Sequence, residues 1–211
     1  MRIVVFGASG GTGRQLLAQG AERGHEMTGF ARNPPAGEGG GARWVRGDVL
    51  EPTDVRGALK GADAVLSALG IGFRRHATTV YSAGTAHIMA AMHAEGVRRL
   101  LCVSTTSLEP PPWSRSPAQR LLASAVLHPL LRRPYGDMAL MERAVTAEDT
   151  LDWTVVRAAR LTDGRRTGRY RTAPGGALRG AWSISRADVA DCLLRHIDAP
   201  ETHRSVVDVA Y

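Results

Sequence analysis

The sequence predicts an α/β domain with a doubly wound parallel sheet. Two observations lead to this prediction. Short runs rich in Val, Ile and Leu alternate with helix-length segments along nearly the whole chain, and the first run leads directly into a glycine-rich turn. Strands joined by crossover helices are parallel, and right-handed crossovers place helices on both faces of the sheet. A length of 211 residues suits one buried core, so we expect residues 1–211 to form a single domain.

The first half of the chain shows this alternation most clearly. Residues 2–6 are a β-branched run, which is typical of a buried strand. Gly24 and Gly96 are suited to end helices, and Pro52 is suited to begin one. In chain order we expect strands at residues 2–6, 26–32, 42–49 and 62–70, and helices at residues 11–23, 52–59 and 79–95.

The second half alternates less regularly. We expect strands at residues 97–105, 151–159 and 205–211, and helices at residues 135–148 and 185–197. Ser185, with Asp188 three residues later, has the pattern of a helix N-cap. The Pro-containing segment 108–134 and the Gly- and Arg-rich segment 162–182 interrupt the alternation. We expect these two segments to form a small substrate lobe over the strand ends.

Composition argues against several classes of function. The net charge is +7, but the basic residues are scattered and are not interleaved with aromatic residues, so we expect no nucleic-acid partner. No apolar run approaches the roughly 20 residues that span a bilayer, so we expect no membrane partner. Cys102 and Cys192 are the only cysteines, which fits a reducing cytoplasm. The seven histidines have no metal-ligand spacing, so we expect no metal.

A glycine-rich turn, GASGGTG, stands between the first predicted strand and the first predicted helix. Glycines let the backbone turn sharply and approach a pyrophosphate, which then meets the free amides and positive end of the following helix. The pattern predicts a Rossmann-type dinucleotide site, with a tight turn that binds no ligand as the alternative. The expected contacts are Gly7, Ser9, Gly10, Gly11, Thr12 and Gly13.

The end of the second predicted strand indicates which dinucleotide binds. NAD enzymes usually have Asp or Glu here for the ribose hydroxyls, whereas this chain has Ala31-Arg32-Asn33. A guanidinium pairs well with a 2′-phosphate through a charge-assisted fork. We therefore expect NADP(H) as the cofactor, held by Arg32, with an ordinary surface arginine as the alternative.

The next strand ends supply further candidates, because ligands bind at the carboxyl ends of the strands in such sheets. Asp48, after the third strand, could accept a hydrogen bond from the adenine amino group. We expect the residues after the fourth strand beside the adenosine ribose and those ending the fifth strand near the nicotinamide. These residues are Ala68, Leu69 and Gly70, and Ser104, Thr105 and Thr106, respectively.

Taken together, GASGGTG, AR, GDV, SALG and VSTTS resemble the atypical short-chain dehydrogenase/reductases. The similarity is to the NAD(P)H-binding group that includes biliverdin reductase B and the NmrA-like proteins, and LDWTVVRAARLTDG and ISRADVA share it. The resemblance implies a Rossmann-type fold and an NAD(P)H cofactor, and it adds Val49, Ala159 and Arg160 to the expected cofactor contacts. The group includes reductases, isomerases and proteins that only sense the dinucleotide, so the resemblance does not indicate a substrate.

The chain departs from the family in its catalytic residues. Typical short-chain dehydrogenases pair a Tyr with a Lys four residues later, but Tyr135 is followed at that spacing by Ala139. The only lysine, Lys60, is predicted to end a helix after the third strand, far from the end of the fifth strand. Arg160 stands where the biliverdin reductase B pattern has a His, so identical substrate chemistry is not implied.

Proton delivery must therefore come from another group. Solvent can replace a dedicated donor when the acceptor is a flavin-like or quinone-like ring. Thr105, Thr106 and Tyr135 are the expected catalytic residues. The Tyr135 phenol can hydrogen-bond a carbonyl oxygen, with an aromatic residue that only packs on the lobe at the start of a helix as the alternative. We expect Asp137 and Glu142 to be solvent-exposed helix residues rather than donors.

The sequence thus predicts an NADP(H)-dependent oxidoreductase that reduces a small aromatic, flavin-like or carbonyl substrate. One alternative is a non-catalytic NADP(H) redox sensor with a protein partner. Another is an isomerase or dehydratase that uses a tightly bound nicotinamide cofactor. We expect a cytoplasmic monomer or homodimer.

Overall fold

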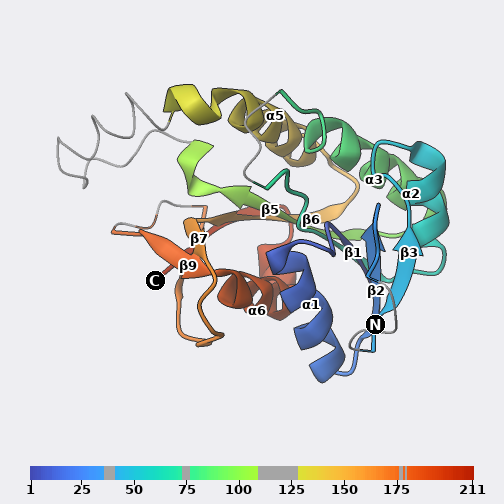
Figure 1. The fold of residues 1–211 in the computed structure, drawn as a ribbon, viewed down its shortest axis with the longest axis horizontal. Helices are drawn as coiled ribbons and strands as arrows, with labels where there is room; N and C mark the ends of the chain where they lie inside the picture. Colours follow the sequence, from blue (N-terminus) through green and yellow to red (C-terminus); the bar gives the residue numbers. More distant parts are fainter. Residues whose placement is uncertain (36–40, 73–76, 109–127, 176–177, 179) are drawn as a thin grey trace.

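Figure 1 shows the computed structural model, which describes residues 1–35, 41–72, 77–108, 128–175, 178 and 180–211. Eight strands form one central sheet, and seven of them run parallel. From one edge to the other they are β3 (Arg43–Arg46), β2 (Glu26–Ala31), β1 (Arg2–Phe6), β4 (Ala64–Ser67), β5 (Arg99–Thr105), β6 (Asp152–Ala158), β10 (Ser205–Ala210) and β8 (Arg171–Pro174). The eighth, β8, pairs antiparallel with β10.

Helices cover both faces of this sheet (Figure 1). One face is covered by α1 (Gly11–Glu22) and α6 (Arg186–His196), and the other by α2 (Pro52–Leu59), α3 (Ser82–Glu95) and α5 (His128–Thr146). Each layer buries its own apolar cluster against the strands, around Leu16 and Val189 on one side and Ile88 and Met92 on the other. The predicted doubly wound, Rossmann-type single domain is confirmed.

The direction of the chain reverses at β1. From β1 the chain moves outward to β2 and β3, and it then returns so that β4 pairs with the opposite edge of β1. Phe6, at the end of β1, lies opposite Phe30 on one side and Ser67 on the other. Open α/β sheets bind ligands in the crevice beyond the strand carboxyl ends at such a reversal. We therefore expect a ligand to bind at the turn that follows Phe6.

The structure corrects the prediction in the second half of the chain. The helix expected from Tyr135 begins at His128 and contains Pro134. Residues 109–127, most of the first expected lobe segment, lie outside the described residues. In the second segment, residues 171–174 form β8, which joins the edge of the main sheet. Its four residues, RTAP, lack the alternation of apolar residues that would have predicted a strand.

Two further short strands were also missed. They are β7 (Arg160–Thr162) and β9 (Ser183–Ser185), which pair in parallel to form a separate two-stranded sheet. The pair brings the residues that follow β6 next to the start of α6. Long-range pairing of three-residue segments leaves too little pattern in the sequence for prediction.

The first turn of α6 is capped as predicted. The Ser185 side chain accepts a hydrogen bond from the Asp188 amide at 2.9 Å. The buried Asp188 carboxylate also accepts hydrogen bonds from the amides of Thr167 and Gly168, both at 2.8 Å, and from the Tyr211 hydroxyl at 2.6 Å. Burial alone would raise the pKa of Asp188, but these hydrogen bonds outweigh it and hold the pKa below its ordinary value.

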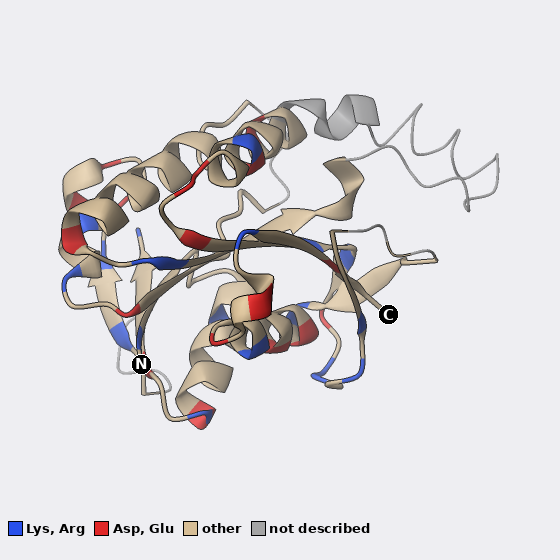
Figure 2. Cartoon of the chain, turned by 180° about the vertical axis from the view of Figure 1, so that it is seen from behind, with Lys and Arg blue, Asp and Glu red and all other residues tan. Residues whose placement is uncertain are grey.

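Charged residues of both signs are interspersed over the side shown in Figure 2. Arg23 with Asp191, Arg56 with Glu95, and other pairs bring opposite charges together. None of the described helices is both long enough and apolar enough to cross a membrane.

Candidate cofactor-binding site

The turn between β1 and α1 needs glycine at two positions for packing. Gly7 has a φ of +75°, and a Cβ there would lie 2.3 Å from the Ala68 carbonyl oxygen. A Cβ on Gly13 would lie 2.3 Å from the Gly7 carbonyl oxygen. These separations are far below any real contact, so Gly7 lets β1 approach β4, and Gly13 lets α1 approach the turn.

The space around Gly10 is more open than the space around Gly7 and Gly13. A Cβ there would meet only the Gly7 carbonyl oxygen within 4 Å, at 3.2 Å, and otherwise would face open space. Gly10 is also the N-cap of α1, and it has no side chain that could cap the helix. No side chain caps the amides of the first turn, where Gly11 is half-buried and Thr12 and Gly13 are buried, so an anion that approaches from the side of Gly10 would meet this helix end. Ser9 and Gly10 are exposed, so the space in front of the turn is accessible.

Arg32 follows β2 directly, at the same edge of the sheet as the glycine turn. It is exposed, and within the described parts of the chain it makes no hydrogen bond or ion pair. Its guanidinium is thus available to a ligand anion.

Asp48 and Val49 form a fixed turn after β3. The Asp48 carboxylate accepts a hydrogen bond from the Leu50 amide at 3.1 Å, and its own amide donates to Asp54 at 3.0 Å. Val49 is buried, and its carbonyl oxygen accepts from Nδ1 of His87 at 3.0 Å. One acceptor site of Asp48 is therefore already used within the turn, and contact with adenine stays a prediction.

The residues after β4 lie against the glycine turn. Ala68 donates its amide to the Phe6 carbonyl oxygen at 2.9 Å, and Ala68 and Leu69 are half-buried. Gly70 is exposed. The structure thus brings the ends of β1, β2, β3 and β4 to one edge of the sheet, as the sequence predicted.

At the end of β5, Ser104 belongs to a buried polar cluster. Its hydroxyl donates to Glu142 of α5 at 2.7 Å, and Glu142 also accepts from Nε of Arg157 at 2.9 Å. Ser104 and Arg157 lie opposite each other in the β5–β6 pairing. Glu142 was wrongly expected to be exposed: it is buried, because α5 packs directly over β6.

Asp137 was also wrongly expected to be exposed. It is buried on α5 and accepts a hydrogen bond from the Tyr81 amide at 2.9 Å and from the Ser82 hydroxyl. These are the residues that begin α3, so Asp137 serves as the N-terminal cap of a neighbouring helix. Sequence reasoning missed this because a cap from another helix leaves no local pattern.

The expected catalytic residues lie near the end of β5. The Thr105 hydroxyl accepts from the Ser107 amide at 3.2 Å, and Thr106 begins the short helix η1 (Thr106–Leu108). Tyr135 of α5 hydrogen-bonds the Ser107 side chain, and burial raises its pKa above the ordinary value. Tyr135 is therefore protonated at neutral pH, and Ser107 connects it to Thr105 through these two hydrogen bonds.

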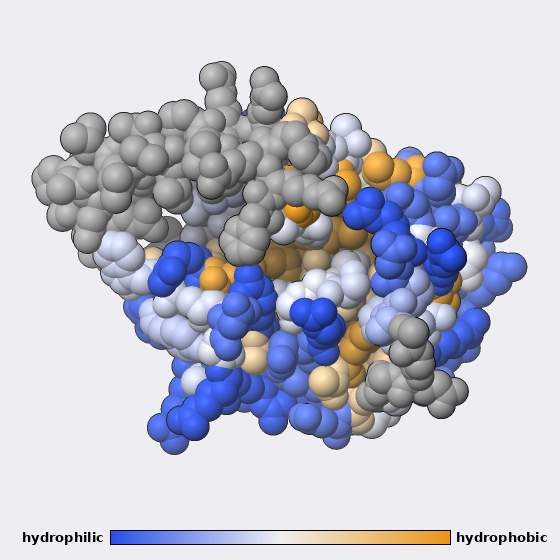
Figure 3. Space-filling view, viewed as in Figure 1, coloured by the Kyte–Doolittle hydropathy of each residue, from blue (hydrophilic) through white to orange (hydrophobic). Residues whose placement is uncertain are grey.

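The residues after β6 divide between core and surface. Ala159 is buried and donates its amide to the Val209 carbonyl oxygen at 3.2 Å. Arg160 is exposed at the start of β7. On the face shown in Figure 3, apolar side chains lie in a recess at the middle of the molecule, next to the atoms drawn in grey.

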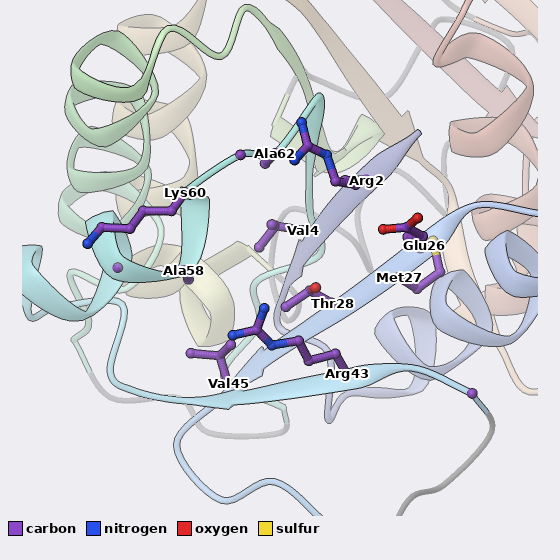
Figure 4. A pocket seen from close by; sticks show the side chains of 13 residues that line it. Arg2, Val4, Glu26, Met27, Thr28, Arg43, Val45, Ala58, Lys60 and Ala62 are labelled. Atoms are coloured by element: carbon purple, nitrogen blue, oxygen red, sulfur yellow. The ribbon is translucent and has the colours of Figure 1, made fainter.

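Figure 4 shows a depression of about 410 Å³ at the opposite edge of the sheet. It lies between the amino ends of β1, β2 and β3 and the end of α2, and its lining includes Arg2, Arg43 and Lys60. Lys60 is the exposed C-cap of α2, as predicted. Since this depression is at the amino ends of the strands, Lys60 is remote from Tyr135. Within the described ranges, His, Cys, Asp and Glu side chains do not form a group of three that could hold a metal ion.

Comparison with known proteins shows which sequences resemble this chain. A family profile described as NAD(P)H-binding matches residues 7–200. The uncharacterized protein YwnB of Bacillus subtilis is 28% identical over 210 residues, which cover 95% of this chain and 94% of YwnB. An uncharacterized Mycobacterium tuberculosis protein is 35% identical over 105 residues, or 50% of this chain. The matched region spans only 12% of that relative's length.

Solved structures share the fold over the whole chain. A Bacillus halodurans protein assigned as an NAD-dependent epimerase/dehydratase is 25% identical with a TM-score of 0.80, covering 100% of this chain and 94% of that one. A short-chain dehydrogenase/reductase of Veillonella parvula in complex with NADP is 19% identical, also with a TM-score of 0.80 and the same coverage. The second likeness is evidence of fold alone.

Proposed function

The chain belongs to the NAD(P)H-binding family, and on that premise we propose that it is an NADP(H)-dependent oxidoreductase that reduces a small aromatic, flavin-like or carbonyl substrate. One observation carries the proposal: the uncapped first turn of α1 and Arg32, which has no partner among the described residues, lie at the same edge of the sheet, at its topological switch point. The two features offer one site for a pyrophosphate and another for a 2′-phosphate.

The residues present fit such a cofactor. The open space in front of Gly10 would be filled by a Cβ, as expected where a pyrophosphate approaches the backbone. Asp48 and Val49 would line the adenine, Leu69 and Gly70 the ribose, and the end of β5 the nicotinamide. The cofactor supplies the hydride when bound. The protein must then position the substrate, exclude water and provide a proton.

Tyr135 is our candidate for the group that orients the substrate. Its half-buried, protonated phenol hydrogen-bonds the side chain of Ser107, just after the end of β5, and can donate a hydrogen bond to a carbonyl or ring acceptor. We propose that the substrate occupies the apolar recess visible in Figure 3, which would favour an aromatic or otherwise apolar substrate over a sugar.

Cofactor choice can be tested by calorimetry with NADPH and NADH. We expect NADPH to bind more tightly by about 1–3 kcal/mol, the range for a charge-assisted contact. Arg32→Gln should remove most of this difference. Arg43→Gln is the matched control, since Arg43 is an exposed arginine at the amino end of β3, on the opposite edge. Equal affinity for both cofactors in the unmutated protein would contradict the assignment.

Turnover separates the oxidoreductase from its alternatives. NADPH oxidation with a panel of flavins, quinones and aldehydes should identify an acceptor class. Purified protein that retains oxidised cofactor would instead favour an isomerase or dehydratase, as the assignment of the Bacillus halodurans protein suggests. Tight binding with no turnover across the panel would favour a redox sensor. We also propose a cytoplasmic location, since both cysteines are free and buried.

A further inference from the structure

The side chain of Arg186 lies across the glycine turn. Arg186 is the first residue of α6, and α6 packs along α1. A Cβ on Gly11 would lie 2.6 Å from Cδ and 3.1 Å from Nε of Arg186. The absence of a side chain on Gly11 therefore leaves room for the Arg186 side chain. The Arg186 guanidinium lies beside the first turn of α1.

The Arg186 side chain is more buried than that of its ion-pair partner, Asp163. Its guanidinium forms a 2.6 Å ion pair with Asp163, yet the Arg186 side chain is only 26% exposed while that of Asp163 is 89% exposed. An ion pair with so exposed a carboxylate contributes little to stability. Another anion that reached Arg186 could replace Asp163 at small cost.

Helix stability does not explain an arginine at this position. Arg186 is the first residue of α6, where the helix dipole disfavours a positive charge. The N-cap is already formed by Ser185 with Asp188, so Arg186 is not needed to begin the helix.

We propose that Arg186 binds the pyrophosphate of the dinucleotide and that Asp163 occupies the guanidinium until the cofactor arrives. The inference rests on the proposed function and adds a phosphate-binding residue to that site. A guanidinium matches two phosphate oxygens with paired N–H donors, whereas the amides of α1 supply single donors. The pyrophosphate would thus lie between the first turn of α1 and Arg186 of α6.

The proposal separates the roles of two arginines. The pyrophosphate is common to NADH and NADPH, so Arg186 should contribute equally to both. Arg32 should contribute to NADPH alone, because only NADPH has the 2′-phosphate. The preference for NADPH and the overall affinity are then set by different residues.

The experiment measures dissociation constants for NADPH and NADH with the full chain by calorimetry. Arg186→Gln should weaken both by about tenfold or more, the effect of losing one charge-assisted contact. Arg186→Lys should recover part of this loss because the charge remains. Asp163→Asn should tighten both several-fold, since a competing anion is removed. The matched control is Arg166→Gln: Arg166 pairs with Glu22 at the far end of α1, and its loss should leave both constants unchanged.

Several outcomes would overturn the inference. If the unmutated protein binds NADPH and Arg186→Gln binds it equally well, Arg186 only tethers the loop that contains Asp163. If Arg186→Gln weakens NADPH but not NADH, Arg186 contacts the 2′-phosphate instead. If Arg186→Gln lowers the melting temperature and leaves both dissociation constants unchanged, the role is structural. If the unmutated protein binds neither dinucleotide, the proposed function itself fails, which is a distinct result.

Discussion

The Ser104 hydroxyl donates a 2.7 Å hydrogen bond to Glu142, which links the end of β5 to α5. This contact fixes the strand end where we place the nicotinamide against the helix that contains Tyr135. Glu142 also forms an ion pair with Arg157, and the side chains of the pair are only 9% and 18% exposed. The geometry of the candidate catalytic region therefore depends on one buried carboxylate.

Removing that carboxylate should destabilise the protein strongly. Glu142→Ala leaves the Arg157 charge largely buried without this partner, and we expect a loss of about 3–5 kcal/mol in the free energy of unfolding. Urea denaturation provides the measurement. Glu95→Ala is the control, because Glu95 pairs with the largely exposed Arg56 and should cost at most about 1 kcal/mol. Similar losses in the two variants would show that the cluster contributes no more than a surface pair.

Two glycines of the same turn should respond differently to valine. Gly10→Val should abolish dinucleotide binding and lower the melting temperature only slightly, since its Cβ would meet only the Gly7 carbonyl oxygen, at 3.2 Å. Gly13→Val should instead lower the melting temperature, since its Cβ would meet backbone atoms at 2.3 Å. Calorimetry and thermal denaturation of both variants test the difference. A folded Gly10→Val protein that still binds NADPH would refute our placement of the pyrophosphate.

Lys60 should be dispensable for turnover. It lies at the end of α2, on the opposite edge of the sheet from Tyr135, where its charge complements the helix dipole. Lys60→Ala should cost roughly 0.3–1 kcal/mol of stability and leave kcat unchanged. A large loss of kcat with normal folding would mean that a catalytic group acts from the amino edge.

Tyr135→Phe tests whether the Tyr135 hydroxyl orients the substrate or donates a proton to it. If Tyr135 only orients a flavin-like ring, kcat should fall several-fold, whereas an obligatory proton donor should cost about 100-fold or more. We expect the smaller effect, because burial raises the pKa of Tyr135 and makes it a weaker acid. The dependence of kcat on pH in the same variant separates the two cases: only loss of a proton donor would change the profile.

Asp188 should contribute stability that depends on pH. Its folded-state pKa is held below the ordinary value of about 3.9, so the contribution is present above that pH and is lost as the pH falls through the folded-state pKa. Asp188→Asn should cost about 1.5–3 kcal/mol at pH 7, the range for hydrogen bonds to a charged group. The difference between the two proteins should shrink below about pH 4, as urea denaturation at several pH values can show. A constant difference down to pH 3 would contradict the prediction.

Local sequence patterns predicted much of the fold. β1 and α2 were predicted with their observed bounds, because β-branched residues form the strand and Pro52 begins the helix. The position of the glycine turn between β1 and α1 was also predicted, because the glycines that allow the turn are neighbours in the sequence. The same holds for the capping of α6 by Ser185.

The rest depends on contacts between distant segments. Glu142 is buried only because α5 lies over β6, and Asp137 caps a helix that begins more than 50 residues earlier. The position of Arg186 against Gly11 requires α1 and α6 to share a face of the sheet. A single sequence contains no pattern that links such pairs, so these parts of the site became visible only in the folded structure.

The two outer strands of the sheet affect how copies of this protein could associate. An open strand edge is a template for pairing with another chain, and natural proteins protect it with short strands, prolines and charged residues. Here β8 and β3 have four residues each; β8 ends in Pro174, and β3 begins and ends with the exposed Arg43 and Arg46. Both edges are thus poorly suited to continuous sheets or amyloid-like stacking. A homodimer would be expected to form through the helical layers instead.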